Sequence, residues 1–271
     1  MSREFDTDFF APSRPRVFGH RGAAGECPEN TLVSFEQAVR AGAQYVELDV
    51  HMTRDGEIVV SHDANLARAC DREGLIAQMT LAEIEAADAG YAFTTDGGAT
   101  FPFRGRRVRI PRLADVLSRF TGTNLVVEIK QTEPSLVARL LATVDRVGAR
   151  RRVMLTSEQD EPVRELRALA PKLPTNFPYT DVAELLQAMA GNRPGYKALG
   201  AAIQIPPQYG TWQLLTPALV AFAHNLGVEV HAWTINDERE MNELLDCGVD
   251  GIISDFPARA LALVRARSAI G

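Results

Sequence analysis

The alternation of short β-rich runs with helical patterns is the feature that most restricts the fold of this chain. Eight β-rich runs are predicted, at residues 16–22, 45–53, 124–130, 152–157, 174–179, 201–205, 228–236 and 251–255. Eight helical patterns lie between or after them, at residues 31–41, 113–120, 135–148, 161–169, 181–190, 217–226, 238–247 and 258–267. This alternation indicates a parallel α/β sheet, and eight such units most simply close into a (β/α)₈ TIM barrel.

An open, doubly wound sheet is the alternative architecture. It is disfavoured because no GxGxxG motif follows the first run, and because the notable polar residues lie in several different strands. The chain has 271 residues, which suits a single barrel of about 250 residues.

The segment after the second run interrupts the alternation. A short extra strand is predicted at residues 58–63, and residues 64–111 are too long for one crossover. We expect an insertion at about 64–111, with a helix at 81–88, lying over the barrel mouth as long functional loops often do. We expect the rest of the chain to consist of an N-terminal arm at residues 1–15, which is expected to be disordered, and a barrel over residues 16–271.

Charge and composition restrict the partners. The net charge of −6 and the lack of a basic stripe argue against nucleic acid. An anionic substrate would therefore need a local cluster of arginine, lysine or metal. Three cysteines without a CxxC pair predict reduced thiols and a cytoplasmic protein. No secretory signal or apolar run of ~20 residues is evident, so no membrane anchor is expected.

The second β-rich run carries Glu47, Asp49 and His51 at alternating positions. Period-two geometry places these side chains on one face of the strand. Both faces of a parallel sheet are usually buried, and two buried carboxylates repel each other unless a cation or proton lies between them. A divalent metal is therefore favoured over purely structural carboxylates, and oxygen-only ligands favour Mg²⁺ or Ca²⁺ over zinc.

Two further runs add basic and acidic side chains. Glu128 and Lys130 share a face of the third run. Glu128 could be a metal ligand and Lys130 a phosphate-binding group, or the two could form a simple ion pair. His20 and Arg21 end the first run between glycines, and arginine offers a fork that matches phosphate. His62 supplies a second imidazole. Two histidines flanking one metal suit acid–base catalysis on a phosphodiester.

Other polar residues have both structural and functional interpretations. Trp233 could pack against a substrate carbon or a choline group, or serve the core. His231 is expected to be a packing residue. Asn30 or Thr31 is predicted to cap a helix, and Asn30 or Glu29 to reach the metal or substrate.

Together these residues resemble the glycerophosphodiester phosphodiesterase family, in its cytosolic bacterial branch. The motifs HRG, PENT, ExD, TxDG, HD, ExK and WT occur in the family's order, and segments such as LVVEIK, HAWTIND and GVDGIISDFP match as well. The match runs from about residue 16 to about residue 257. Residues 174–179 and 201–209 match only loosely, and Gln204 is considered as a pocket residue.

The resemblance implies a TIM barrel with a small inserted subdomain and a defined set of site residues. Its implied roles are the acid–base pair His20 and His62, the metal ligands Glu47, Asp49 and Glu128, and the substrate- and phosphate-binding residues Arg21, Lys130 and Trp233.

The implied reaction is metal-dependent hydrolysis of glycerophosphodiesters to sn-glycerol 3-phosphate and an alcohol. The glycerol 2-hydroxyl would attack phosphorus and water would open the cyclic product, with direct attack by water as the alternative. Two other functions are considered: a phospholipase D-like or lysophospholipase D-like enzyme acting on a lipid, and a non-catalytic barrel that binds phosphodiesters. The latter would normally have lost a histidine or a carboxylate.

Overall fold

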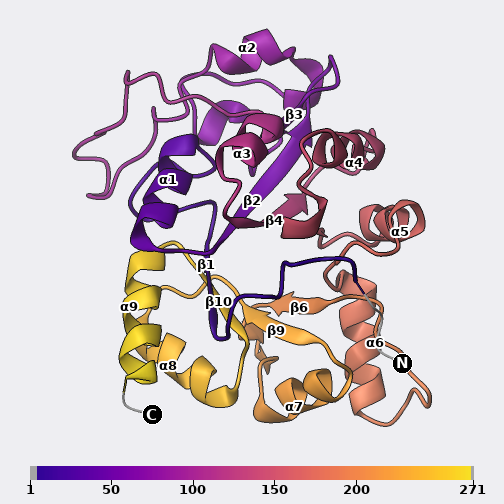
Figure 1. Ribbon diagram of the computed structural model, residues 1–271. Coiled ribbons are helices and arrows are strands. Elements are labelled where there is room, and N and C mark those ends of the chain that lie inside the picture. Colours follow the sequence, from indigo (N-terminus) through magenta and orange to yellow (C-terminus); the bar gives the residue numbers. More distant parts are fainter. Residues whose placement is uncertain (1–4, 270–271) are drawn as a thin grey trace.

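A computed structural model describes residues 5–269 of the chain. Its central feature is a curved parallel sheet with helices around it (Figure 1). Seven strands are hydrogen-bonded in the order β5-β4-β2-β1-β10-β9-β6. They are β1 (Arg16–Gly19), β2 (Tyr45–Met52), β4 (Asn124–Ile129), β5 (Val153–Thr156), β6 (Ala202–Ile205), β9 (Glu229–Ala232) and β10 (Gly251–Ser254).

The eighth position of the ring is held by two residues instead of a full strand. Thr175 forms a parallel bridge with Leu155 of β5, and Asn176 forms one with Ala202 of β6. The strand predicted at residues 174–179 is reduced to these bridges, because prolines at both ends lack the N–H that a ladder requires. The bridges close the ring, and the predicted TIM-barrel fold is confirmed.

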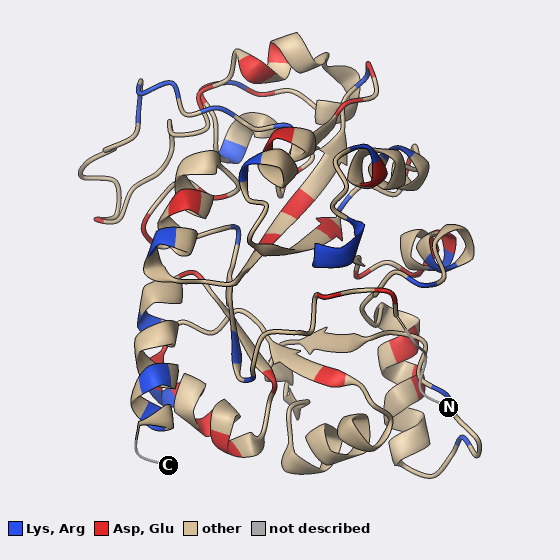
Figure 2. Ribbon diagram, viewed as in Figure 1, with Lys and Arg blue, Asp and Glu red and all other residues tan. Residues whose placement is uncertain are grey.

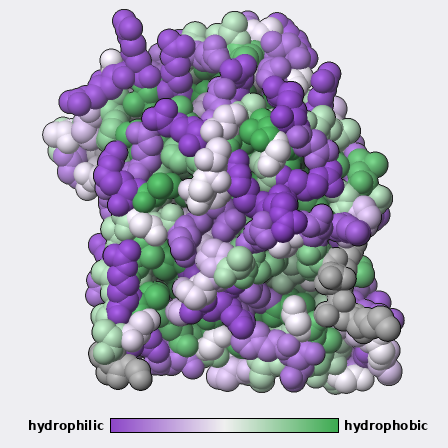
Figure 3. Space-filling view, in the orientation of Figure 1, coloured by the Kyte–Doolittle hydropathy of each residue, from purple (hydrophilic) through white to green (hydrophobic). Residues whose placement is uncertain are grey.

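Eight helices surround the ring, and their apolar sides pack against the strands (Figure 1). Lys, Arg, Asp and Glu recur along most of these helices (Figure 2), and hydrophilic and hydrophobic residues are interspersed on the face seen in Figure 3. Thr31 caps the first helix, because its side chain accepts a hydrogen bond from the N–H of Ser34. The helices are α1 (Leu32–Ala41), α3 (Leu113–Arg119), α4 (Val137–Arg146), α5 (Asp160–Leu169), α6 (Tyr179–Met189), α7 (Pro217–Asn225), α8 (Glu238–Cys247) and α9 (Pro257–Ser268).

The insertion between β2 and α3 has a small core of its own. It contains β3 (Ile58–Val60), which pairs antiparallel with β2, two short 3₁₀ turns (Leu66–Arg68 and Ile76–Gln78) and α2 (Leu81–Glu85). Its buried apolar residues pack together, and Figure 1 shows the insertion at one edge of the ring, beside α1 and α3.

The N-terminal segment is ordered over residues 5–15, so the prediction of a disordered arm is wrong there. Phe9 is fully buried against Tyr45, and the Tyr45 hydroxyl donates a 2.7 Å hydrogen bond to the carbonyl of Phe9. Arg16 donates to the carbonyl of Phe10 at 2.8 Å. Figure 1 shows the segment passing across the ring. Burying Phe9 covers the amino-terminal end of the barrel, whereas residues 1–4 lie outside the described part of the chain.

No helix within residues 5–269 combines the length and the apolar character needed to span a bilayer.

Candidate active site

A cavity of about 190 Å³ opens at the carboxyl ends of the parallel strands. The strands bring all eight predicted site residues to its wall, although these residues are spread over more than 200 positions of the sequence. Gln204 and Glu158 also line it. The predicted residues are His20, Arg21, Glu47, Asp49, His62, Glu128, Lys130 and Trp233.

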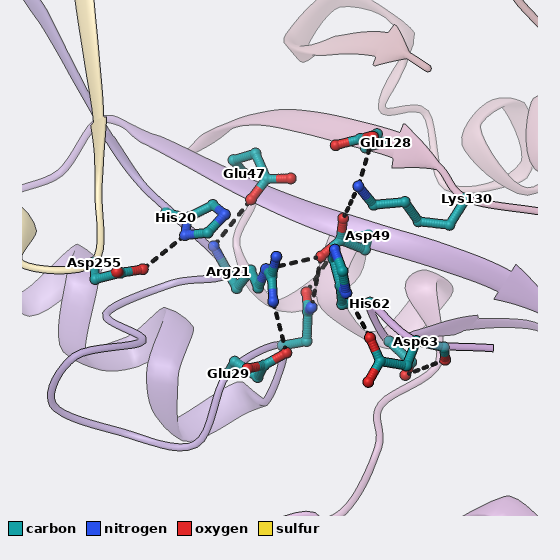
Figure 4. A network of polar contacts seen from close by, with 12 residues as sticks. His20, Arg21, Glu29, Glu47, Asp49, His62, Asp63, Glu128, Lys130 and Asp255 are labelled. Atoms are coloured by element: carbon teal, nitrogen blue, oxygen red, sulfur yellow. Dashed lines mark hydrogen bonds and ion pairs between the residues drawn. The ribbon is translucent and has the colours of Figure 1, made fainter. Parts of the chain in front are cut away.

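Three carboxylates form a compact group on two neighbouring strands. Glu47 and Asp49 of β2 and Glu128 of β4 each present an oxygen, and these atoms all lie within 4.8 Å of one another. The register pairs Asp49 directly with Glu128, which explains why alternate residues of two strands converge (Figure 4). Glu47 and Asp49 are buried. Three oxygen donors of this kind suit a hard divalent cation.

The raised pKa values of two of these three carboxylates indicate that their negative charges are not fully neutralised by neighbouring residues. Burial and the charge of Asp49 raise the pKa of Glu47 to about 8, and burial raises the pKa of Glu128 to about 7 although Lys130 opposes this. Burial also acts on Asp49, but Lys130 and Arg21 outweigh it and hold the pKa of that carboxyl below its ordinary value. Within the described residues, the carboxylate of Glu47 accepts a hydrogen bond only from the N–H of Arg21. The cluster therefore fits a bound cation.

Two basic side chains lie against the carboxylates. Lys130 Nζ is 2.7 Å from Glu128 Oε1 and 3.4 Å from Asp49 Oδ1, so the predicted Glu–Lys ion pair exists within the site. Arg21 Nε is 3.3 Å from Asp49 Oδ2 and, within residues 5–269, makes no hydrogen bond of its own. The side chains of Arg21 and Lys130 both line the cavity, where each could hold a phosphate oxygen.

The loop that presents His20 and Arg21 depends on its two glycines. A Cβ added to Gly19 would lie 2.4 Å from the carbonyl oxygen of Gly22. Gly22 has φ +90°, and a Cβ there would lie 2.4 Å from Ser34 Oγ.

Each of the two site histidines is held by an aspartate. His20 Nδ1 lies 2.6 Å from Asp255 Oδ1, and His62 Nδ1 lies 2.7 Å from Asp63 Oδ1. Asn236 fixes Asp255, because its amide donates to Asp255 Oδ2 at 2.6 Å. These contacts leave Nε2 of each ring available to a ligand in the cavity. Burial lowers the pKa of His20, but the bond to Asp255 and the charge of Glu47 raise it more.

The insertion supplies part of the support for His62. Arg68 donates to Asp63 Oδ2 at 2.5 Å and to Glu29 Oε1 at 2.6 Å, and Glu29 in turn accepts from Arg21 at 2.9 Å. Glu29 therefore contacts the site indirectly, because it pairs with Arg21, which lines the cavity, and with Arg68, which holds Asp63. Sequence reasoning missed the role of Arg68, which no motif marks.

Asn30 and His51 support the site from behind. The amide of Asn30 donates to Asp49 Oδ2 at 2.8 Å, and the N–H of Asp49 donates back to Asn30 Oδ1 at 3.2 Å. His51 Nε2 bonds the backbone carbonyl of His62 at 3.0 Å. Both residues therefore position groups that line the cavity.

On the opposite wall of the cavity, the side chains of Trp233 and Gln204 contact residues of the barrel interior. Trp233 is partly buried against an interior cluster that includes Phe18 and Ile253. His231 is fully buried, as predicted, and its Nδ1 lies 3.3 Å from Gln204 Nε2. Gln204 is thus a pocket residue held by an interior histidine.

A barrel whose mouth combines two aspartate-held imidazoles, two cations and three clustered carboxylates defines a phosphodiester-cleaving enzyme. Comparison with known proteins agrees with this class. The family model described as "Glycerophosphoryl diester phosphodiesterase family" matches residues 20–259. A glycerophosphodiester phosphodiesterase of Caldanaerobacter subterraneus is 31% identical over 255 residues, covering 92% of this chain and 97% of the relative.

Two other proteins extend the comparison. A phosphodiesterase of Oleispira antarctica, solved in complex with the product sn-glycerol-3-phosphate, has a TM-score of 0.73 and 27% identity, covering 93% of this chain and 97% of that one. A lysophospholipase D of Rattus norvegicus is 26% identical, covering 90% of this chain and 84% of the relative. The chain belongs to the glycerophosphoryl diester phosphodiesterase family and is an enzyme that hydrolyses glycerophosphodiesters.

Proposed function

We propose that the enzyme releases sn-glycerol 3-phosphate and an alcohol from small glycerophosphodiesters, with His20 and His62 as its acid–base pair and a divalent cation as cofactor. The carrying observation is that two imidazoles, each held at Nδ1 by an aspartate, line the same cavity as the carboxylate cluster. General acid–base catalysis needs this arrangement: one group to remove a proton and one to supply a proton.

The proposed cation site consists of Glu47, Asp49 and Glu128, whose oxygens converge within 4.8 Å. Oxygen donors favour Mg²⁺ or Ca²⁺. A bound cation would neutralise phosphate charge. Arg21 and Lys130 would bind the phosphate oxygens, and Trp233 would line the pocket beside the glycerol or head group.

In the proposed reaction, one histidine takes the proton of the glycerol 2-hydroxyl as its oxygen attacks phosphorus. The bond to the alcohol oxygen breaks, and the other histidine protonates that oxygen. Water then opens the cyclic phosphate. A substrate without the 2-hydroxyl should be inert, and rapid turnover of such a substrate would favour direct attack by water instead.

The relationship to the rat lysophospholipase D supports a second candidate substrate, a lysophospholipid. A cytoplasmic location is proposed on the three free cysteines, Cys27, Cys70 and Cys247.

The deciding experiment measures sn-glycerol 3-phosphate released from glycerophosphocholine and glycerophosphoethanolamine, with and without EDTA, and after Mg²⁺ or Ca²⁺ is restored. Release that chelation abolishes and one metal restores is expected, and the ratio of rates ranks the head groups. Release unaffected by EDTA would contradict the metal dependence, and no release with any metal would contradict the choice of small substrates.

A further inference from the structure

Three aromatic side chains stand exposed on one side of the barrel. Tyr209 is 74% exposed, Trp212 is 73% exposed and Tyr179 is 56% exposed. Tyr209 and Trp212 are the two most exposed large hydrophobic residues in the described part of the chain. Large aromatic side chains normally bury most of their surface, so such exposure marks an interaction site. We call these three residues the aromatic rim.

The aromatic rim lies at the mouth of the catalytic cavity. Tyr209 and Trp212 face each other across a hairpin of two short strands, β7 (Gln208–Tyr209) and β8 (Trp212–Gln213). This hairpin follows the carboxyl end of β6, the strand whose Gln204 lines the cavity. The carboxyl ends of barrel strands form the edge at which the active site opens.

Tyr179 ties the rim to the cavity wall directly. Its hydroxyl donates a 3.0 Å hydrogen bond to Glu158, which lines the cavity. Burial and this bond raise the pKa of Tyr179, and the charges of Tyr209 and Glu128 act in the same direction.

The chain around the hairpin carries no formal charge. Residues 198–223 include no Asp, Glu, Lys or Arg, although these residues make up 24% of the protein. Figure 2 shows α7, which follows the hairpin, without blue or red along its length. Within this stretch residues 208–213 are exposed, whereas β6 before them is largely buried. An exposed segment without charge can approach an apolar phase without stripping water from ionic groups.

This chemistry fits a lipid surface better than a charged partner. Tyrosine and tryptophan prefer the boundary between water and lipid, where the ring meets apolar groups and the polar atom meets water. The net charge of −6 would repel an anionic surface, so the matching surface is zwitterionic. The substrate class itself has a lipid-borne form, in which the glycerol keeps one acyl chain.

We propose that the aromatic rim docks the enzyme on zwitterionic lipid aggregates, and thereby admits glycerophosphodiesters that carry an acyl chain as well as the soluble ones. The acyl chain would leave the cavity past Tyr209 and Trp212 and remain in apolar surroundings. The inference rests on the proposed hydrolysis for its substrate but not for its binding, which can be measured alone.

The first test measures binding to phosphatidylcholine vesicles by co-sedimentation, for the wild-type enzyme and the double variant Tyr209→Ser/Trp212→Ser. The matched control is Leu169→Ala, which removes a side chain that is 57% exposed at the last residue of α5, the end of that helix away from the mouth. We expect the double variant to bind at least tenfold more weakly and the control to bind like wild type.

The second test compares two substrates. On micellar lysophosphatidylcholine the double variant should lose about tenfold in kcat/KM, whereas on soluble glycerophosphocholine it should match wild type. That unchanged rate also shows that the variant is folded. If neither the wild type nor the double variant hydrolyses glycerophosphocholine or glycerophosphoethanolamine, the proposed function fails, and the vesicle measurement still decides the docking.

Several outcomes would overturn the inference. One is that the wild type fails to co-sediment with phosphatidylcholine vesicles. Another is that it binds only anionic vesicles and dissociates in high salt, which would point to the exposed arginines Arg106, Arg107 and Arg109 instead. A change of oligomeric state in the double variant, measured by analytical ultracentrifugation, would assign the rim to a second copy of the chain. Equal loss on both substrates would make the rim part of the cavity.

Discussion

Asp255 Oδ1 lies 2.6 Å from His20 Nδ1, although 235 positions separate the two residues in the sequence. The contact exists because β1 and β10 are parallel neighbours, with Gly19 beside Ser254 in the register. Asp255 is also fixed by Asn236. The aspartate therefore sets the orientation of the ring and the nitrogen that faces the cavity, and we assign it as a positioning residue.

The variant Asp255→Asn should lower kcat by roughly 10²-fold, within the range of general acid–base contributions. Because Asp255 raises the pKa of His20, its loss should also move the limb of the pH–rate profile that reports His20 to lower pH. The measurement is kcat and kcat/KM from pH 5 to 9, with His20→Ala as the reference for complete loss of the ring. A lower kcat with an unmoved profile would contradict the assignment.

Cation binding should release protons. The pKa of Glu47 is raised to about 8 and that of Glu128 to about 7, so near neutrality Glu47 is mostly protonated and Glu128 about half protonated before a cation binds. Affinity for Mg²⁺ or Ca²⁺ should therefore rise as the pH increases from 6 to 8. Calorimetric titration in two buffers of different ionisation enthalpy measures the protons released, and a pH-independent affinity would contradict the protonation of these groups.

The carboxyl of Glu47 should also affect the stability of the metal-free protein. The pKa of Glu47 is about 8 in the folded protein, above its ordinary value of 4.5, so the folded state binds more protons than the unfolded state between these values. Its contribution to stability is fully present below about pH 4.5 and is lost as the pH rises towards 8. In EDTA, Glu47→Gln should therefore gain in Tm relative to wild type between pH 5 and pH 8. With a saturating divalent cation the order should reverse, as thermal melts would show.

The loop that carries His20 and Arg21 should not tolerate a side chain at Gly22. Its φ of +90° and the 2.4 Å approach of a Cβ to Ser34 Oγ should make Gly22→Ala cost at least about 2 kcal/mol in the free energy of unfolding. Gly122→Ala is the matched control, since nothing lies within 4 Å of a Cβ there. Urea denaturation of the two variants checks the difference, and equal stabilities would contradict it.

Much of the site follows from local pattern. Alternation in two β-rich runs was enough to place Glu47, Asp49, Glu128 and Lys130 on common faces, because a strand repeats every two residues. The barrel then brings the two faces together, since β2 and β4 are neighbours in the ring.

Other features depend on contacts that sequence order does not show. The partnership of Asp255 with His20 requires the first and last strands to be adjacent, and no local pattern marks it. The burial of Phe9 depends on the open end of the barrel that it covers. The strand predicted at residues 174–179 shrank to two bridges because its flanking prolines limit the ladder.

The closure of the ring by β1 and β10 also bears on the order in which the parts of the site are synthesised. A ribosome makes His20 early, but the aspartate that orients it is residue 255 of 271. Until the last strand emerges, the nascent chain holds the carboxylate-bearing strands β2 and β4 without the aspartate partner of His20. A chain whose translation stops before this point lacks both the aspartate partner of His20 and the strand that closes the ring, so efficient cleavage of the phosphodiester requires synthesis to pass residue 255.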